Sequence, residues 1–401
     1  MTRTRLCLGV ALVAITGWLA TGCGGSSSDE LVIGEFGSLT GGDATFGQST
    51  KNGVQVALDE LQAKSAGAIG GLKVRVVVED DQGRAEEAAT VVQKLVNQDR
   101  VVALLGEVAS SRSLAGAPIC QNAGVPMISP SSTNPRVTQV GDYVFRMCFL
   151  DDFQGNVMAR FVADSLKIKK VAILKDVRSD YSVGLAQYFT QGFAAKGGTV
   201  VVEQSYSAGD QDFRAQLTAI KAKKPQAVIV PGYYTEAGLI ARQARELGIT
   251  VPLVGGDGWE SAQLLQIGGD ALNGCYYSNH WALDRQDPAL QRFLATYRAK
   301  FKSDPDAIGG LAYDAANVLF GSLATLATQD PQTFKGFASS KAGTEARKAA
   351  DAKLRDLIAA TANYAGVTGM ITLDQNRNAS KPAVIIEIKD GKKLYNSTIS
   401  P

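Results

Sequence analysis

The sequence predicts an α/β protein built from two doubly wound, Rossmann-like lobes that are joined by a three-segment hinge. Three observations predict this fold: short β-branched runs alternate with amphipathic helical stretches, the alternation occurs twice, and the chain has 401 residues. Short strands separated by helices are typical of a parallel sheet covered by helices. A chain of this length exceeds one ordinary domain and suits two lobes, each large enough to bury its own core.

The first series of elements begins with a strand over 31–33 and a helix over 48–61. Its further strands are expected at 74–79, 101–105 and 125–128, with helices at 85–96 and 113–123. The second series repeats the rhythm with strands at 171–174, 199–203, 227–230 and 251–254.

Two pairs of residues relate the series to each other. Gly232 lies 126 positions after Gly106, and Pro252 lies at the same offset from Pro126. A shared offset indicates one topology used twice. Ligands of open parallel sheets bind beyond the carboxyl ends of the strands, so four loops from two facing lobes should meet at one cleft.

The C-terminal part adds elements to these lobes rather than a third domain. Helices are expected over 288–301, 313–327 and 342–360, and a hairpin around Asp390 and Gly391 pairs 383–388 with 393–395. We therefore expect the chain to cross between lobes near residues 149, 281 and 365. This assigns 30–149 with 281–364 to the N-terminal lobe, and 150–280 with 365–401 to the C-terminal lobe.

The first 23 residues have the layout of a bacterial export signal. Arg3 and Arg5 precede an apolar run over 6–20, which ends in small residues just before Cys23. This ending resembles a lipobox, whose cysteine would be lipidated and hold the protein at a membrane. A secreted protein cut nearby without lipidation is the alternative. The glycines and serines of 24–29 suit a flexible tether.

Charge and cysteine usage exclude several classes of function. The 41 basic and 39 acidic residues leave no excess charge for nucleic acid, which we do not expect as a partner. The cysteines of the mature chain, Cys120, Cys148 and Cys275, match no zinc pattern, and we expect no metal and no cofactor. In an oxidising compartment Cys120 and Cys148 could form a disulfide; the alternative is three inert buried thiols.

Signatures of an enzyme are weak throughout. The segment 42–49 is one residue from a phosphate-binding loop, but Gln48 replaces the lysine that would neutralise the phosphates. The single histidine, His280, lies at a predicted crossing without a nucleophile elbow, and we interpret it as a structural hinge residue. The acidic pairs 80–81 and 151–152 are interpreted as solvated strand ends or helix caps.

Several segments resemble the branched-chain amino-acid binding proteins of the type I periplasmic binding-protein superfamily. They are 37–41, 46–47, 106–111, the Ser-Pro-x-x-Thr-Asn-Pro stretch within 125–135, and 145–155, in the same order and at similar spacing. The likeness covers essentially all of 30–400. It implies the type I periplasmic binding-protein fold and a solute-binding component of an ABC importer.

The resemblance also implies a ligand site. The residue that binds the ligand carboxylate falls on Ser110. A main-chain acceptor falls on Ser131, and a hydroxyl touching both ends of an amino acid falls on Thr133. The acidic partner of the ligand ammonium falls on Asp257, where glutamate is usual. Aromatic walls fall on Phe46, Tyr181, Tyr233 and Tyr313, and Trp259 is a further candidate wall. Helix caps and turns for the hydroxyls, and core packing for the rings, are the alternative interpretations.

These observations predict a monomeric, exported protein in the periplasm or on the cell surface, which delivers an amino acid to a permease and ATPase complex without changing it. A branched-chain or other aliphatic amino acid is the expected ligand. A sensory receptor of the same fold, or a binder of an amide or small carboxylate, is the alternative.

Overall fold

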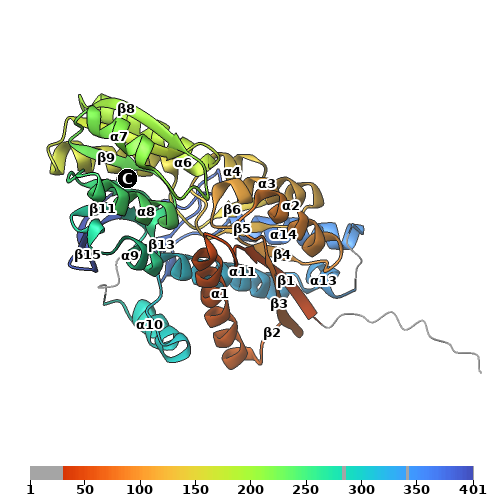
Figure 1. Cartoon of the computed structure of the whole chain (residues 1–401). Coiled ribbons are helices and arrows are strands. Elements are labelled where there is room, and N and C mark those ends of the chain that lie inside the picture. Colours follow the sequence, from red (N-terminus) through yellow and green to blue (C-terminus); the bar gives the residue numbers. More distant parts are fainter. Residues whose placement is uncertain (1–29, 282–285, 340–342, 401) are drawn as a thin grey trace, which may run out of the picture.

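The computed structural model describes residues 30–281, 286–339 and 343–400, which form two lobes with one large sheet each (Figure 1). The expected signal peptide over 1–23, its Cys23 and the tether over 24–29 lie outside the described residues.

The N-terminal lobe is built on a six-stranded sheet in the order β2-β3-β1-β4-β5-β6, in which only β2 is antiparallel. The strands are β1 (Glu30–Gly37), β2 (Ala68–Ile69), β3 (Leu72–Asp80), β4 (Ala103–Leu105), β5 (Met127–Ser129) and β6 (Val144–Arg146). The helices are α1 (Ala44–Ser65), α2 (Ala85–Asn97), α3 (Ser110–Ala123), α4 (Arg136–Gln139), α10 (Pro288–Phe301), α11 (Ala307–Gln329), α12 (Pro331–Phe334), α13 (Gly336–Ser339) and α14 (Glu345–Ala359). A small ribbon of β12 (Tyr364–Gly366) and β13 (Gly369–Ile371) also packs here.

The C-terminal lobe is built on a seven-stranded sheet in the order β15-β14-β11-β10-β9-β7-β8. Its strands are β7 (Lys170–Asp176), β8 (Thr199–Tyr206), β9 (Ala227–Val230), β10 (Leu253–Gly255), β11 (Cys275–Asn279), β14 (Ala383–Lys389) and β15 (Lys392–Ile399). Its α-helices are α5 (Asp151–Arg160), α6 (Asp180–Ala195), α7 (Arg214–Ala222), α8 (Tyr234–Glu246) and α9 (Ala262–Gly268); a π-helix, η1 (Phe161–Ser165), and two 3₁₀ turns, η2 (Asp257–Trp259) and η3 (Gly269–Leu272), complete the lobe.

The two sheets confirm the predicted repeat. Strands β3-β1-β4-β5-β6 of the first sheet and β8-β7-β9-β10-β11 of the second have the same order and are parallel. The 126-residue offset that relates Gly106 to Gly232 also relates β5 to β10 residue by residue. The structure is therefore the type I periplasmic binding-protein fold, with two doubly wound lobes.

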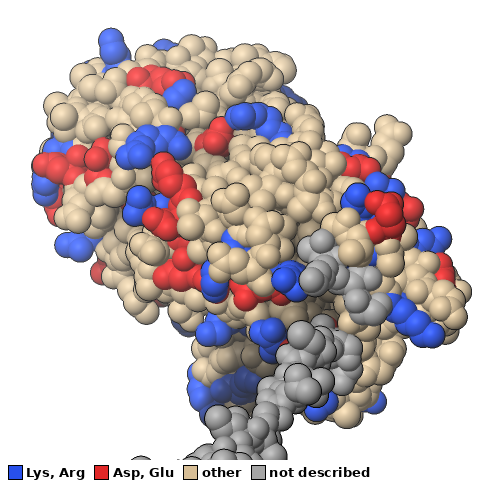
Figure 2. All heavy atoms as spheres, turned by 90° about the vertical axis from the view of Figure 1, so that its right-hand side faces the viewer, with Lys and Arg blue, Asp and Glu red and all other residues tan. Residues whose placement is uncertain are grey.

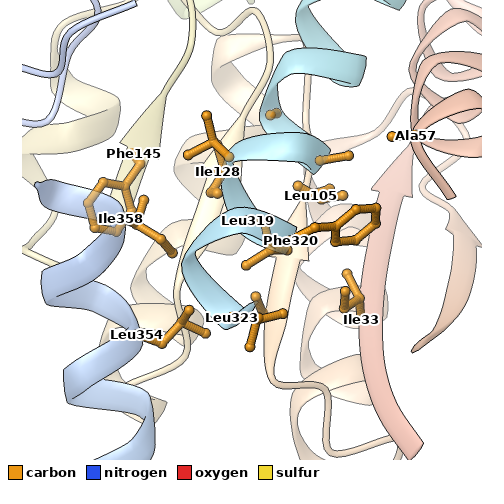
Figure 3. Packing of buried hydrophobic residues seen from close by; sticks show 14 of the residues in the cluster. Ile33, Ala57, Leu105, Ile128, Phe145, Leu319, Phe320, Leu323, Leu354 and Ile358 are labelled. Atoms are coloured by element: carbon orange, nitrogen blue, oxygen red, sulfur yellow. The ribbon is translucent and has the colours of Figure 1, made fainter. Parts of the chain in front are cut away.

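A long apolar helix fills the core of the N-terminal lobe on one side of its sheet. Figure 3 shows Leu319, Phe320 and Leu323 of α11 between the sheet and α14. The capping residue Asp306 starts this helix, because its Oδ1 accepts a hydrogen bond from Gly309 N at 2.9 Å. By length and composition alone α11 is the one described helix that could cross a membrane, but 78% of its most apolar stretch is buried inside the lobe.

The chain crosses between the lobes at three places. Cys148 packs in the core of the N-terminal lobe, whereas Phe149 packs in the C-terminal lobe. The second crossing follows β11, since Trp281 packs against α10. The third lies between Ala379 and Ala383, because residues up to Ala379 still pack in the N-terminal core. The boundary expected near 365 is therefore about 15 residues too early.

The expected disulfide between Cys120 and Cys148 is absent, and all three described cysteines are free. Cys120 packs with Met127 on one side of the first sheet, whereas Cys148 packs with Ile128 on the other. Because neighbouring residues of β5 point to opposite faces, the sheet separates the two thiols. Burial raises the pKa of both thiols to about 12, so they stay protonated and unreactive.

Acidic and basic side chains are mixed on the face of the molecule drawn in Figure 2. Exposed ion pairs also occur among the described residues, such as Arg214 with Glu246 at 3.0 Å. This face therefore shows no broad patch of one sign.

Candidate functional site

A cavity lies between the lobes, where the carboxyl ends of their strands face each other. The N-terminal lobe contributes residues near the start of α1, after β4 and β5, and at the start of α11. The C-terminal lobe contributes residues at the start of α6 and after β9 and β10. The lining residues are Phe46, Val108, Ser131, Thr133, Tyr181, Tyr233, Asp257, Gly258 and Ile308. The structure thus brings together six of the eight residues expected from the sequence.

The lobes are closed over this cavity at both of its edges. At one edge, Thr235 Oγ1 donates a hydrogen bond to Gly42 O at 2.7 Å, and Thr45 N donates to Tyr234 Oη at 3.2 Å. At the other edge, Asp180 N donates to Ser111 Oγ at 2.9 Å. Each bond joins one lobe to the other, so the structure is the closed form of a hinged clamp.

Hydroxyl groups and a helix N-terminus form the N-terminal wall. Ser110 is the first residue of α3, where backbone N–H groups and the helix dipole favour an anion. It is not among the residues that line the cavity but follows the lining residue Val108 by two positions, and its hydroxyl accepts a hydrogen bond from Asn134 N at 3.2 Å. Thr133 lines the cavity, and its buried hydroxyl lies beside the carboxyl group of Asp151. This wall is suited to a carboxylate.

A buried arginine fixes the loop that carries Ser131 and Thr133. Arg146 donates hydrogen bonds to Ser132 O at 2.5 Å and to Asn134 O at 2.8 Å. The Ser132 hydroxyl contacts the main-chain oxygen of Val108 at 3.0 Å, which ties this loop to the loop after β4. These contacts hold the N-terminal wall rigid without touching the cavity themselves.

Aromatic rings line the C-terminal wall. Tyr181 and Tyr233 are stacked with centroids 5.3 Å apart, and Phe46 meets Tyr233 edge to face at 5.4 Å across the cleft. Tyr181 Oη accepts a hydrogen bond from Gly258 N at 3.0 Å. A side chain at Gly258 would meet Gly232 O at 2.8 Å, so glycine is required for this close approach.

Asp257 is the acidic group of the cavity, and both of its oxygens have partners. Gln154 Nε2 donates to Oδ1 at 2.7 Å, and His280 Nε2 lies 2.9 Å from Oδ2. The same His280 nitrogen is 3.5 Å from Ser131 Oγ in the other lobe. His280 lies at a crossing, as expected, but the sequence did not predict its contact with the acid. Burial lowers the pKa of His280 below its ordinary value.

Asp151 is a second buried carboxyl group behind the cavity, which we had interpreted as a solvated end or cap. It is fully buried at the start of α5, where the hydroxyl of Thr133 lies close enough to act on it as a hydrogen-bond partner. Its pKa is raised well above the ordinary value by burial and by the nearby charge of Asp257. The acidic pair 151–152 was the available signal, but pairs of this kind are usually solvated.

Two expected wall residues lie elsewhere. Tyr313 of α11 points away from the cavity, donates a hydrogen bond to Glu60 Oε2 at 2.8 Å and packs against Phe293. Ile308 of the same helix lines the cavity instead, because five residues turn a helix by about 140° beyond a full circle. Trp259 is buried in the C-terminal core, where its Nε1 donates to Val230 O at 3.0 Å.

Comparisons with known proteins agree with this architecture. Residues 30–393 match the family model described as periplasmic binding protein. The chain is 32% identical over 308 residues to a leucine-, isoleucine-, valine-, threonine- and alanine-binding protein of Pseudomonas aeruginosa, which covers 76% of this chain and 81% of that protein.

Two solved structures are also similar. The leucine-binding protein LivK of Thermotoga maritima has a TM-score of 0.84 at 35% identity, over 92% of this chain and 99% of that one. The substrate-binding protein LivJ of Streptococcus pneumoniae, in complex with isoleucine, has a TM-score of 0.82 at 32% identity, over 93% and 100% of the two chains. This chain belongs to the periplasmic binding protein family.

Proposed function

We propose that this chain is the extracytoplasmic, lipid-anchored solute-binding component of an ABC importer and that it holds an aliphatic α-amino acid between its lobes. The observation that carries the proposal is that three kinds of chemical group lie in separate parts of the cavity. Hydroxyls and a helix N-terminus stand on one wall, a carboxylate stands on the other, and apolar groups lie between them. An α-amino acid carries the matching carboxylate, ammonium and side chain.

The ligand carboxylate is assigned to the N-terminal wall. Thr133 places a buried hydroxyl on the cavity wall, and a hydroxyl can donate a hydrogen bond to a carboxylate. Ser110 and the first turn of α3 would complete the anion site.

The ligand ammonium is assigned to Asp257, with Ser131 opposite. A buried ammonium requires an acidic partner, and Asp257 is the acidic residue that lines the cavity. The side chain would pack on Phe46, Val108 and Ile308, which favours an aliphatic group. The relatives whose names state leucine, isoleucine and valine binding support this choice.

The closed clamp suits a protein that delivers its ligand to a permease without changing it. Family membership supports a binding protein that changes shape around its ligand and performs no covalent step. The closed form would be the one presented to a permease, because the edge contacts of Thr235 and Ser111 form only when the lobes meet.

The ligand assignment is tested by titrating ligand-stripped protein with each of the twenty common amino acids by calorimetry. We expect the strongest binding from leucine, isoleucine or valine. A protein that gives no heat and no thermal shift with any amino acid would remove the proposed ligand.

The anchor is tested separately with Cys23→Ser in full-length protein expressed in a bacterium. Wild-type protein should sediment with membranes and incorporate labelled fatty acid, whereas the variant should do neither. Equal incorporation in both would contradict lipidation at Cys23.

An amide or small carboxylate is a second candidate ligand, and one observation favours it. Both oxygens of Asp257 already have partners, so a ligand without a positive charge would leave that arrangement intact. Titration with 4-methylpentanoate and 4-methylpentanamide beside leucine decides between them, since tighter binding of either analogue would support the second candidate.

A further inference from the structure

His280 occupies an unusual position, in contact with cleft residues of both lobes. It follows β11 at the second crossing, and its side chain is 1% exposed. Its Nε2 lies 2.9 Å from Asp257 Oδ2 and 3.5 Å from Ser131 Oγ. The ring packs on Phe149 with centroids 4.0 Å apart.

Burial of His280 favours the neutral imidazole, whereas its contact with Asp257 acts in the opposite direction. With its proton on Nε2, the ring donates to Asp257, and Nδ1 needs no acceptor. Protonation would add an N–H at Nδ1, which has no hydrogen-bond partner among the described residues. The charged groups that act on the ring are Asp257 and Glu260, which favour the cation, and Lys381, which disfavours it.

The charge state of His280 decides what Asp257 offers to a ligand. While the imidazole is neutral, Asp257 keeps its negative charge for a cation in the cavity. Once the imidazole is protonated, His280 and Asp257 together carry no net charge. The imidazolium then contacts the same carboxylate that would bind the ligand ammonium. The two cations then compete for one acidic group.

We propose that His280 is a positioning residue that controls how strongly the cleft retains an amino group: neutral His280 orients Asp257 for the ligand ammonium, and protonated His280 displaces that ammonium. The proposal rests on the proposed amino-acid ligand. His280 is also among the residues of a groove at the hinge, beside Thr368, Lys381 and Pro382.

The direction of the pH effect follows from linkage. Ligand ammonium beside Asp257 opposes a second positive charge, so binding lowers the pKa of His280. Affinity is therefore highest at pH values above the pKa of the ligand-free protein and falls as the pH drops through it. The dissociation constant for leucine should therefore rise severalfold between pH 8 and pH 5.5.

The experiment compares wild type with His280→Gln, whose amide can still donate to Asp257 but does not titrate. Calorimetry at pH 8, 7, 6 and 5.5 measures the dissociation constants of leucine and 4-methylpentanoate. Wild type should lose affinity for leucine as the pH falls, and His280→Gln should stay within about twofold. Neither protein should lose affinity for 4-methylpentanoate through this group, because that ligand has no ammonium.

Comparison of wild type with His280→Gln also controls for other groups that titrate in the same pH range. Burial raises the pKa of Glu236 to about 7 and that of Asp306 to about 6, and both groups are present in wild type and variant. Parallel loss of leucine affinity in the two proteins would therefore overturn the role of His280. Failure of wild type to bind leucine, isoleucine or valine at pH 8 would instead count against the proposed ligand.

A second measurement uses the wild-type protein alone and so does not depend on whether a variant folds. The chain has one histidine, so the imidazole NMR signals of the full protein belong to His280 alone. Leucine should move the pH midpoint of these signals downward, whereas 4-methylpentanoate should not. An unchanged midpoint in protein that binds leucine would refute the proposal.

Discussion

The two lobes share one topology but differ in the chemistry of their loops. Strands β5 and β10 occupy equivalent places in the two sheets, and each is followed by a loop at the cleft. The loop after β5 carries Ser131 and Thr133, whereas the loop after β10 carries Asp257. Repetition of the fold thus places two loops face to face, and their different residues give the cavity two distinct ends.

The lobes also hold their site residues in different ways. Arg146 holds the first loop by donating hydrogen bonds to main-chain oxygens. The side-chain hydroxyls of that loop therefore remain available to a ligand. In the second loop, by contrast, Gln154 and His280 contact the carboxylate oxygens of Asp257 directly. The N-terminal wall should therefore tolerate loss of a single donor better than the C-terminal wall tolerates loss of its acid.

The largest expected effect is that of Asp257→Ala. An ammonium left unpaired in the closed cleft costs about 3–5 kcal/mol, or more than about a hundredfold in affinity. Calorimetry should show this loss for leucine and a much smaller one for 4-methylpentanoate. If the variant binds leucine as well as wild type does, the C-terminal wall does not hold an ammonium.

Ser110→Ala should have a smaller effect on the opposite wall. One neutral hydroxyl among several donors to a carboxylate is worth about 1.5–3 kcal/mol. The loss should be the same for leucine and 4-methylpentanoate, because both carry the carboxylate. A loss confined to leucine would place the ammonium, rather than the carboxylate, at Ser110.

The neighbouring Ser111 offers a matched control for Ser110. Its hydroxyl accepts the hydrogen bond from Asp180 N across the cleft, without lining the cavity. Ser111→Ala should therefore cost only about 0.5–1.5 kcal/mol through weaker closure, equally for all ligands. Small-angle scattering should show more open protein at subsaturating ligand, and an effect as large as that of Ser110→Ala would remove the distinction between the two serines.

Asp151→Asn should change stability rather than specificity. Because the pKa of Asp151 is raised in the folded protein, its ionisation is harder there than in the unfolded chain. Wild type thus loses stability as the pH rises above about 4, the unfolded pKa, and the neutral amide avoids this loss. The variant should be more stable than wild type at pH 7, and the gain should vanish near pH 4. Thermal unfolding at both pH values measures this difference, and a variant less stable than wild type at pH 7 would contradict it.

The sequence by itself determined the repeated βα pattern and the loops that form the cleft. Alternation of apolar runs and the 126-residue offset are local or periodic signals, which survive without knowledge of long-range contacts. The resemblance then carried Phe46, Thr133, Tyr181 and Asp257 to one cavity, because these residues sit in loops whose place the fold dictates.

Only the tertiary structure decided which way side chains point and which residues contact each other. The face that α11 turns to the cleft selects Ile308 over Tyr313, and a sheet separates Cys120 from Cys148. The contact of His280 with Asp257 joins positions 23 residues apart that follow two different strands. Each outcome depends on which side of a helix or sheet meets another element, and packing between segments distant in sequence sets that choice.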